Sequence, residues 1–417
     1  MLKAKSMTTH QPHRGPLTGL KVVEITHIMA GPTCGLMLAD MGADVIKVER
    51  LPRGDDTRRT IPPTINGESA AFMMMNRNKR GIAIDFKQPA GIAALRRLIL
   101  QADVLVENLR TGALAHYGLG YETLKAEHPG LIYCSITGFG LTGPYAERGG
   151  FDLIAQGMSG LMSITGDMPT AENRNPAPVK VGAPMTDITA GILSAMGILA
   201  ALYHRQQTGQ GQQVDTSLFE AGITHTYWQS AICLATGVSP GPLGSAHPLM
   251  APYQAFETAD GWINIGAANQ ANWEKLIKAL AAEHLGADPR FVNNAGRLTN
   301  LPELVKLLTP YFHHHTTTEW MTIFEEIGLP AGPVLSITEM HADPQTVARE
   351  MLVEVEHSRV GKVKTMGLPV KFSETPGSIR HGAPVMGEHT REVLLEAGYS
   401  VDEIDSLIAE GAIVAAL

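Results

Sequence analysis

The stretch LKVVEITHIMAGPTCGLMLADMGADVIKVER, residues 20–50, is typical of a strand, a helix and a second strand in succession. The apolar run Leu20–Ile25 predicts the first strand, and a helical stretch ending near Gly42 follows a turn at His27–Pro32. The run Ala43–Val48 then predicts the second strand. Because a helical crossover joins strands that run in the same direction, this unit predicts a parallel sheet and an α/β fold.

The alternation of strands and helices continues to residue 136. Further strands with few polar residues are predicted at Gly81–Phe86, Asp103–Val106 and Leu131–Ile136. Such strands are buried on both faces, so we expect helices on both sides of a Rossmann-like sheet. Ligands of these sheets bind beyond the carboxyl ends of the strands. The predicted ends are THIMAGP (26–32), VERLPRGD (48–55), ENLRTG (107–112) and TGFGLTGP (137–144).

The length of 417 residues, 44% of them hydrophobic, indicates more than one domain. We expect residues 1–225 to form the first part of a large Rossmann-like domain. Residues 226–345 are expected to form a linker and a small α+β domain, and residues 346–417 a segment that returns to the large domain. Within the middle segment, Ser239–Pro252 is dense in Pro and Gly and predicts a linker or lid, and Trp262–Ala267 predicts a strand.

The composition argues against several classes of partner. A net charge of -8 provides no overall basic field to attract nucleic acid or an anionic membrane. The three cysteines lack metal-ligand spacing, which fits a reduced protein without a metal site. The longest apolar stretch, Ile188–Tyr203, is shorter than the ~20 residues that cross a bilayer. Residues 1–15 lack the apolar region of a secretory signal and predict a short disordered lead, so we expect a cytoplasmic protein.

Cations near the predicted strand ends suit a phosphorylated nucleotide. The G-x-G-x-x-G fingerprint of dinucleotide-binding proteins is absent, since Pro32 interrupts the first turn, and a nicotinamide oxidoreductase is therefore disfavoured. Glu49 lies where a ribose carboxylate would be expected, but Arg50 follows at once. Arg50 and Lys79 are candidates to bind the 3′-phosphate and pyrophosphate of coenzyme A, although most surface cations are merely solvated.

Asp187 is the most informative carboxylate, because a long helix of apolar and small residues starts there. One interpretation is a helix N-cap, a role that Asp performs well. The other is a nucleophile, since a helix N-terminus favours an ionised carboxylate and the preceding loop VKVGAPMT is rich in Gly and Pro. Gly191 and Gly197 within the helix indicate close packing of backbone or ligand. Spacing alone does not decide between cap and nucleophile.

Seven motifs extend in order along the chain between Leu17 and Ala409. They are AGPTCGLMLADMGADVIKVER (30–50), NRNKRGIAID (76–85), ADVLVENLRTG (102–112), FDLIAQGMSGLMSITG (151–166), VGAPMTDITAG (181–191), ALYHRQQTGQGQQVDTSLFEA (201–221) and MGEHT (386–390). In these motifs the chain resembles the class III CoA-transferases, a family that includes formyl-CoA transferases and succinyl-CoA-dependent dicarboxylate transferases. The resemblance predicts transfer of coenzyme A from one carboxylic acid to another.

The resemblance also implies roles for the matching residues. It makes Asp187 the nucleophile, which carries acyl anhydride and aspartyl-CoA thioester intermediates, and it puts Asp152 near the thioester. The residues that it places against coenzyme A are Met29, Ala30, Arg50, Ile84, Asn108 and Leu109. It implies that coenzyme A is a substrate rather than a permanently bound cofactor, and that two subunits thread through each other as an interlocked homodimer.

The region SPGPLGSAHPLMAPYQAF (239–256) departs from the oxalate-handling members, because it lacks their glycine-rich lid. It resembles instead the branch that uses succinyl-CoA with glutarate or similar dicarboxylates. That likeness implies that Ser245, His247 and Tyr253 contact the distal carboxylate of the acceptor, although a His beside a Pro is more often structural.

Two other functions stay open at this point. The α-methylacyl-CoA racemases share the family fold, but this chain has Phe151-Asp152 where they have a His-Asp pair, and Phe cannot abstract a proton. A non-catalytic protein would bind acyl-CoA without exchanging coenzyme A between acids.

Overall fold

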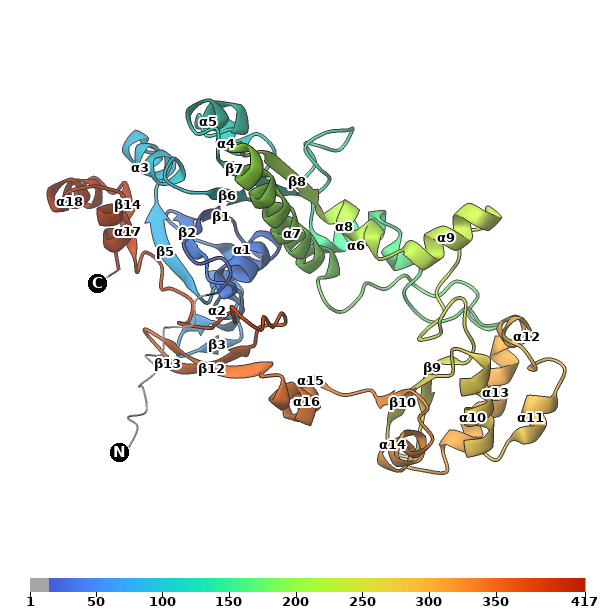
Figure 1. Ribbon diagram of the computed structural model, residues 1–417. Coiled ribbons are helices and arrows are strands. Elements are labelled where there is room, and N and C mark those ends of the chain that lie inside the picture. The colour runs from blue at the N-terminus through green and yellow to red at the C-terminus, as the bar shows by residue number, and fades with distance from the viewer. Residues whose placement is uncertain (1–14, 417) are drawn as a thin grey trace, which may run out of the picture. The chain divides into compact units, whose positions relative to one another are not determined.

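The structure is a computed structural model that describes residues 15–416, so the predicted N-terminal lead lies almost wholly outside the described residues. Strand β1 (Lys21–Ile25) leads into helix α1 (Ala30–Asp40), which leads into strand β2 (Asp44–Arg50). The two strands pair in parallel (Figure 1). The predicted α/β fold with a parallel sheet is confirmed.

A seven-stranded sheet contains this unit, in the order β14-β5-β2-β1-β6-β7-β8. The other strands are β5 (Lys79–Ile84), β6 (Val104–Glu107), β7 (Ile132–Thr137), β8 (Gln213–Ser217) and β14 (Ile413–Val414). Every neighbouring pair is parallel except β14 with β5. The edge strands β8 and β14 were not predicted, because β8 has the polar sequence QVDTS and β14 spans only two residues.

Helices cover both faces of the sheet and enclose two apolar cores. One core includes α3 (Pro89–Ile99), α4 (Ala113–His116), α5 (Tyr121–Glu127), α17 (Thr390–Glu396) and α18 (Val401–Ala409). The other includes α1, α6 (Asp152–Met158), α7 (Met185–Thr208) and α8 (Leu218–Thr224). Successive strand residues alternate between the cores, since Val22 packs with α1 and Val23 with α3. With both faces covered, ligands reach this sheet at the ends of its strands.

Helix α7 is the long helix predicted from Asp187, although it begins two residues earlier, at Met185. By length and composition alone it could cross a membrane, but its buried residues pack in the core formed with α1. The packing is closest at Gly191, where a Cβ atom would lie 2.5 Å from the carbonyl oxygen of Ala30. Gly191 therefore allows the start of α1 to lie against the first turns of α7.

The chain divides into two compact units. The first contains the residues up to Ser159, Val181–His225 and the residues from Pro344 onward, and the second contains Gly160–Lys180 and Thr226–Asp343. The sequence-based boundaries at 225 and 345 lie beside two of these divisions, whereas Gly160–Lys180 was assigned to the large domain. Shorter elements of the first unit are η1 (Asp56–Arg59), β3 (Thr64–Ile65), β4 (Glu68–Ser69), α2 (Ala70–Met75), α16 (Pro344–Ala348), β12 (Leu352–His357) and β13 (Gly361–Met366).

The second unit combines an antiparallel sheet with helices. Its strands are β9 (Tyr253–Glu257), β10 (Trp262–Gly266) and β11 (Ala331–Pro333). Its helices are η2 (Leu161–Ser163), α9 (Tyr227–Thr236), α10 (Gln270–Ala279), α11 (Glu283–Ala287), α12 (Asn294–Thr299), α13 (Leu301–Phe312), α14 (Thr317–Glu326) and α15 (Ile337–Ala342). Its core is aromatic, with the rings of Phe256 and Phe312 stacked 4.4 Å apart. Strand β10 matches the predicted strand.

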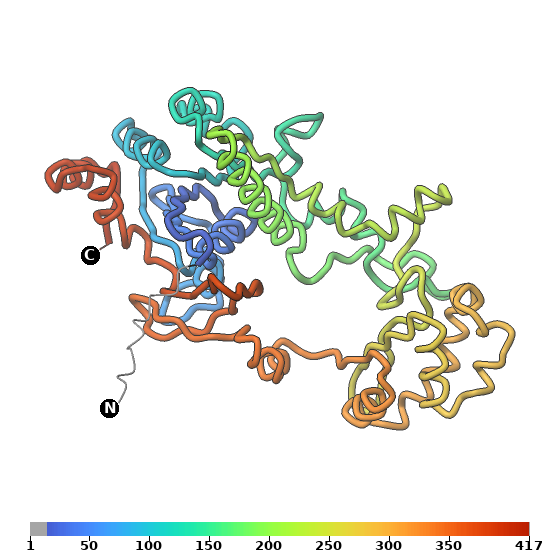
Figure 2. The backbone as a smooth tube through the Cα atoms, viewed as in Figure 1, coloured from blue at the N-terminus to red at the C-terminus, as the bar shows by residue number. Residues whose placement is uncertain are grey.

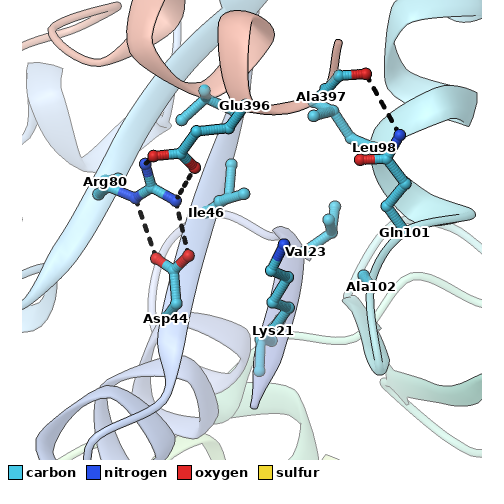
Figure 3. A pocket seen from close by; sticks show the side chains of 12 residues that line it. Lys21, Val23, Asp44, Ile46, Arg80, Leu98, Gln101, Ala102, Glu396 and Ala397 are labelled. Atoms are coloured by element: carbon cyan, nitrogen blue, oxygen red, sulfur yellow. Dashed lines mark hydrogen bonds and ion pairs between the residues drawn. The ribbon is translucent and has the colours of Figure 1, made fainter. Parts of the chain in front are cut away.

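The tail of the chain returns to the first unit, where β14 pairs with β5 (Figure 2). Arg80 of β5 fixes the tail at the amino ends of the strands, because it bridges Asp44 of β2 to Glu392 and Glu396 of α17 at 2.6–2.8 Å. A small pocket lies beside this cluster (Figure 3). Three carboxylates already surround its one arginine, so we interpret the cluster as a structural clamp.

Candidate active site

A pocket opens at the carboxyl ends of β1, β6 and β7. The turns after these three strands line it, together with residues 147–151 and Asp187 of α7. A second pocket of about 510 Å³ includes the end of β2, and His27 and Leu109 belong to both. β1 and β6 are neighbours from which the sheet is extended in opposite directions, and such a crevice is where open α/β sheets bind ligands.

Asp187 is the third residue of α7 and does not cap the helix, because the N-cap position belongs to Pro184. The capping group comes instead from Asp152, the first residue of α6. Its Oδ1 atom accepts hydrogen bonds from the backbone nitrogen of Thr186 at 3.0 Å and from the Thr186 hydroxyl at 2.8 Å. Within residues 15–416 no group donates a hydrogen bond to the Asp187 carboxylate, which leaves both oxygens available to a ligand.

Burial and the nearby charge of Asp152 raise the pKa of Asp187 to about 7. The helix N-terminus alone was expected to keep this carboxylate ionised, so the structure changes that expectation. Removal from water disfavours the charged form, and a second carboxylate close by adds to the effect. Asp187 is therefore poised between its neutral and ionised forms near neutral pH, as is common for groups at functional sites.

Asp152 and Gln156 together brace the segment that precedes Asp187. The Nε2 atom of Gln156, which is fully buried, donates to Asp152 Oδ2 at 2.8 Å. Its Oε1 atom accepts from the backbone nitrogen of Val181 at 2.9 Å. The resemblance placed Asp152 near the thioester, and in the structure its hydrogen bonds go to Gln156 and to Thr186, at the start of α7.

Arg50 ends β2 and is the free cation of the second pocket. It is exposed, and the structure gives it no ion-pair partner within residues 15–416. Glu49 differs, because it is buried and its Oε1 atom lies 2.5 Å from Arg58 Nη2. A buried, paired carboxylate does not serve a ribose, whereas the guanidinium group of Arg50 is open to the second pocket.

Two of the predicted coenzyme A ligands are fully buried. Lys79 is the first residue of β5, with Nζ 2.8 Å from Glu24 Oε2 and 2.9 Å from the carbonyl oxygen of Pro32. Burial lowers its pKa to about 8. The prediction for Lys79 was wrong, because the first residue of a strand lies at its amino end, and Lys79 lines neither pocket. Ile84, at the end of β5, has its side chain in the core beside α3.

The other predicted ligands lie together in the pocket. Met29 and Ala30 line it from the turn after β1, and Asn108 and Leu109 line it from the turn after β6. Asn108 joins the two turns, since its side chain both donates to the backbone oxygen and accepts from the backbone nitrogen of His27, each at 2.9 Å.

The sequence analysis missed His27, Gly149 and Gly150 as pocket residues. His27 could have been found, because it lies in the first strand end, THIMAGP. The segment 147–150 follows the fourth strand end by a few residues, and nothing in its own pattern marks it as a pocket wall.

Ser245, His247 and Tyr253 lie together within the second unit. The His247 and Tyr253 rings are 5.3 Å apart, and the hydroxyl of Ser245 accepts a hydrogen bond from the backbone nitrogen of Ala255 at 3.0 Å. The Nδ1 atom of His247 accepts from the backbone nitrogen of Leu249 at 3.1 Å, which puts the ring proton on Nε2. Burial lowers the pKa of His247, so the ring is neutral at pH 7 and can donate through Nε2.

Comparison with known proteins agrees with the sequence resemblance. Residues 17–390 match the family described as CoA-transferase family III. A succinate–glutarate CoA-transferase of Agrobacterium fabrum is 40% identical over 94% of this chain and 98% of its own. The human succinyl-CoA:glutarate CoA-transferase is 37% identical over 95% of this chain and 90% of its own.

A solved structure supports the same assignment. The CAIB/BAIF family protein from Brucella suis has 41% sequence identity and a TM-score of 0.81, over 92% of this chain and all of its own. The likeness extends over both units, so it is not limited to the sheet that many nucleotide-binding proteins share. The resemblance found in the motifs is confirmed, and the chain belongs to CoA-transferase family III, as an enzyme that transfers coenzyme A between acyl-CoA and carboxylic acids.

Proposed function

We propose that the protein transfers coenzyme A from succinyl-CoA or a similar donor to a dicarboxylate acceptor, through covalent intermediates on Asp187. Class III transferases use CoA thioesters as substrates and need no permanent cofactor. One observation carries the proposal: Asp187 lines the pocket, and Asp152 rather than Asp187 caps helix α7. Capping therefore does not account for an aspartate at position 187. The relatives named for succinate and glutarate support the classes of donor and acceptor.

In the first half-reaction the Asp187 carboxylate attacks the thioester carbonyl of the donor. An oxygen–carbon bond forms, the carbon–sulfur bond breaks, and coenzyme A leaves as a thiolate from a mixed anhydride. The thiolate then attacks the side-chain carboxyl carbon of Asp187, which gives an aspartyl-CoA thioester and releases the donor acid. Each step exchanges one activated acyl bond for another, so the reaction consumes no external source of energy.

The second half-reaction reverses these steps with a different acid. The acceptor carboxylate attacks the aspartyl-CoA thioester, coenzyme A leaves as a thiolate, and a new mixed anhydride forms. The thiolate attacks the acceptor acyl carbon, which yields the product thioester and restores the Asp187 carboxylate. The glycine backbone at Gly138, Gly149 and Gly150 lines the pocket and can supply N–H groups to the developing oxyanions.

The nucleotide end of coenzyme A fits the second pocket in this proposal. Arg50 would meet a phosphate there, and the pantetheine chain would pass His27 and Leu109, which both pockets share. Met29, Ala30 and Asn108 would then contact the part of coenzyme A that leads to Asp187. A guanidinium group beside a phosphate provides charge-assisted hydrogen bonds that suit an anionic ligand of an acidic protein.

The pH dependence of the first half-reaction should follow the ionisation of Asp187. Only the carboxylate is nucleophilic, so its activity is lost as pH falls through the pKa of about 7. We expect kcat/KM for the donor thioester to fall about tenfold per pH unit well below that pKa and to level off above it. Steady-state assays of product thioester formation at a fixed acceptor concentration between pH 5.5 and 8.5 measure this profile.

Asp152→Asn provides the control for this profile. The amide can still accept the hydrogen bonds of Thr186 but carries no charge, so the midpoint should move to lower pH. The movement should be partial, because burial contributes more than Asp152 to the raised pKa of Asp187. A rate that stays constant across the range would contradict the assignment of Asp187 as the nucleophile.

A racemase reaction remains the alternative, and no observation favours it. Phe151 stands before α6 with 67% of its surface exposed, and its ring offers no base to the α-carbon of an acyl group. We expect no exchange of the α-proton of 2-methylacyl-CoA in deuterated buffer at a rate near that of transfer. Mass spectrometry of the recovered thioester checks this, and exchange as fast as transfer would restore the racemase hypothesis.

We also propose an interlocked homodimer in the cytoplasm, with no membrane or nucleic-acid partner. Helix α9 has no buried residue and exposes 88% of Leu234, and α7 exposes 60% of Met196. Large exposed apolar side chains of this kind are typical of surfaces that another subunit covers. Light scattering at nanomolar to micromolar protein should find a dimer throughout, because threaded subunits separate only by unfolding, and a folded monomer would contradict the proposal.

A further inference from the structure

The backbone of Ile28 adopts an unfavourable conformation in the turn between β1 and α1. Its φ angle is 67°, in the left-handed region, where a β-branched side chain is a genuine outlier. Such a conformation is energetically unfavourable and persists only where surrounding groups impose it. The turn it belongs to, His27–Ala30, forms one wall of the pocket that contains Asp187.

Hydrogen bonds from two directions hold this turn. Asn108 binds both backbone groups of His27, as described above. The backbone nitrogen of Ile28 itself donates to Asp55 Oδ1 at 3.0 Å. Asn108 lines the pocket that contains Asp187, whereas Asp55 borders the second pocket with only 2% of its surface exposed. Its hydrogen bond to Ile28 is its link to the wall of the pocket beside Asp187.

Asp55 is fixed by a buried charge network. Its Oδ1 atom also accepts from the backbone nitrogen and hydroxyl of Thr57, at 2.9 and 2.7 Å. Its Oδ2 atom lies 2.9 Å from Lys47 Nζ, and Lys47 lies 3.2 Å from Glu24, which also pairs with Lys79. The two lysines and two carboxylates balance in charge, and all four lie in the interior, where the loss of one partner is costly.

We propose that Asp55 is a positioning residue for the transfer reaction. By holding the Ile28 N–H it keeps the His27–Ala30 turn in the shape that lines the pocket. The start of α1, which this turn leads into, lies against the first turns of α7 through Ala30 and Gly191, so the same hydrogen bond sets the wall beside Asp187. The kinetic test of this inference rests on the proposed function. The predicted effect of Asp55 on coenzyme A binding can be measured without it.

A double-mutant cycle tests whether Asp55 acts through Ile28. Asp55→Ala should weaken coenzyme A binding and lower kcat/KM by roughly 10- to 100-fold, as misplacement of a site wall by about 1 Å does. Glycine adopts positive φ without strain, so Ile28→Gly removes the need for an imposed conformation. In the Asp55→Ala background, Ile28→Gly should raise kcat/KM again by at least about fivefold. If Asp55 were merely structural, the losses of kcat/KM from the two substitutions would add.

Asp40→Asn is the matched control. Asp40 is 3% exposed and pairs with Arg77 at 2.6 Å in the same unit, but it lines neither pocket. The Asp40→Asn variant should have a lower melting temperature than the wild type and a coenzyme A affinity within about twofold of the wild-type value. If Asp55→Ala does not fold, Asp55→Asn replaces it: its amide oxygen can still hold the Ile28 N–H, so the folded variant should lose stability but keep its affinity.

Calorimetric titration with coenzyme A provides the binding readout, and the succinyl-CoA assay provides kcat/KM. Loss of affinity in folded Asp55→Asn, or no recovery by Ile28→Gly, would overturn the positioning role. A wild-type protein that binds coenzyme A but transfers none would instead contradict the proposed function. The coenzyme A titrations of the variants would still test whether Asp55 positions the turn.

Discussion

Replacement of Asp187 by Asn should reduce CoA transfer by a factor on the order of 10³ or more, the size of loss seen when a covalent nucleophile is removed. The amide keeps the shape of the side chain but cannot form the mixed anhydride. Since no described group hydrogen-bonds to Asp187 and Asp152 caps the helix, the exchange should leave the fold and coenzyme A binding intact. Steady-state kinetics with succinyl-CoA and glutarate, with a coenzyme A titration alongside, measure both.

Trapping gives an independent readout of the same step. Wild-type protein quenched with succinyl-CoA and treated with hydroxylamine should carry a hydroxamate on the peptide that contains Asp187, and Asp187→Asn should carry none. Asp402→Asn is the matched control, because Asp402 also lies in the first turn of a helix, α18, but outside both pockets. A folded Asp187→Asn variant with full activity and no adduct in the wild type would defeat the covalent mechanism.

The stability of Asp187→Asn should also depend on pH in a defined direction. The folded-state pKa of Asp187, about 7, lies above its ordinary value of 3.8, so the folded protein holds this proton more tightly than the unfolded chain. Ionisation therefore removes stability as pH rises from about 4 through 7. The variant should melt at a higher temperature than the wild type at pH 8, and the difference should vanish near pH 4.

Short dicarboxylates should be much better acceptors than formate or oxalate. We expect kcat/KM with succinate or glutarate to exceed that with oxalate by on the order of 100-fold, because polar groups placed to hydrogen-bond a distal carboxylate discriminate against acids that lack one at that distance. The absence of the glycine-rich lid and the cluster of Ser245, His247 and Tyr253 motivate this expectation. A panel of acids assayed with succinyl-CoA measures it, and a preference for oxalate would refute it.

His247→Ala should separate acceptor use from coenzyme A binding. Loss of the Nε2 donor should raise KM for glutarate roughly tenfold, the cost of about one charge-assisted hydrogen bond, with coenzyme A affinity unchanged. His313→Ala is the matched control, because His313 is another histidine of the second unit, exposed and beside Glu257. Equal effects of the two variants would show that His247 has no role in acceptor recognition.

The fold could be predicted well because each inner strand of the central sheet contains buried apolar residues. Because buried positions require apolar residues, apolar runs mark the strands in the sequence. The predicted strands that begin at Leu20, Ala43 and Leu131 agree with the observed bounds to within a few residues. The edge strand β8 escaped, since half of its side chains face outward and its sequence is polar. An edge pairs on one side only, and the pattern of one short segment does not reveal that pairing.

The site was predictable only in part, for a related reason. Strand ends singled out Arg50, and the family resemblance singled out Met29 and Asn108. All three line the pockets at the carboxyl ends of the parallel strands. The strand-end argument failed for Lys79, because Lys79 is the first residue of β5 and therefore lies at the amino end of the strand. The exchange of roles between Asp152 and Asp187 depends on contacts across 34 positions of sequence, which no local pattern contains.

The late return of the chain to the first unit bears on its synthesis by the ribosome. The edge of β5 pairs with Ile413 and Val414, and the arginine clamp at Arg80 needs Glu392 and Glu396. Until those residues leave the exit tunnel, a nascent chain presents an unpaired strand edge, which is a template for aggregation. The whole second unit is translated in that interval, so protection of β5 by a chaperone would benefit this chain more than one whose sheet closes early.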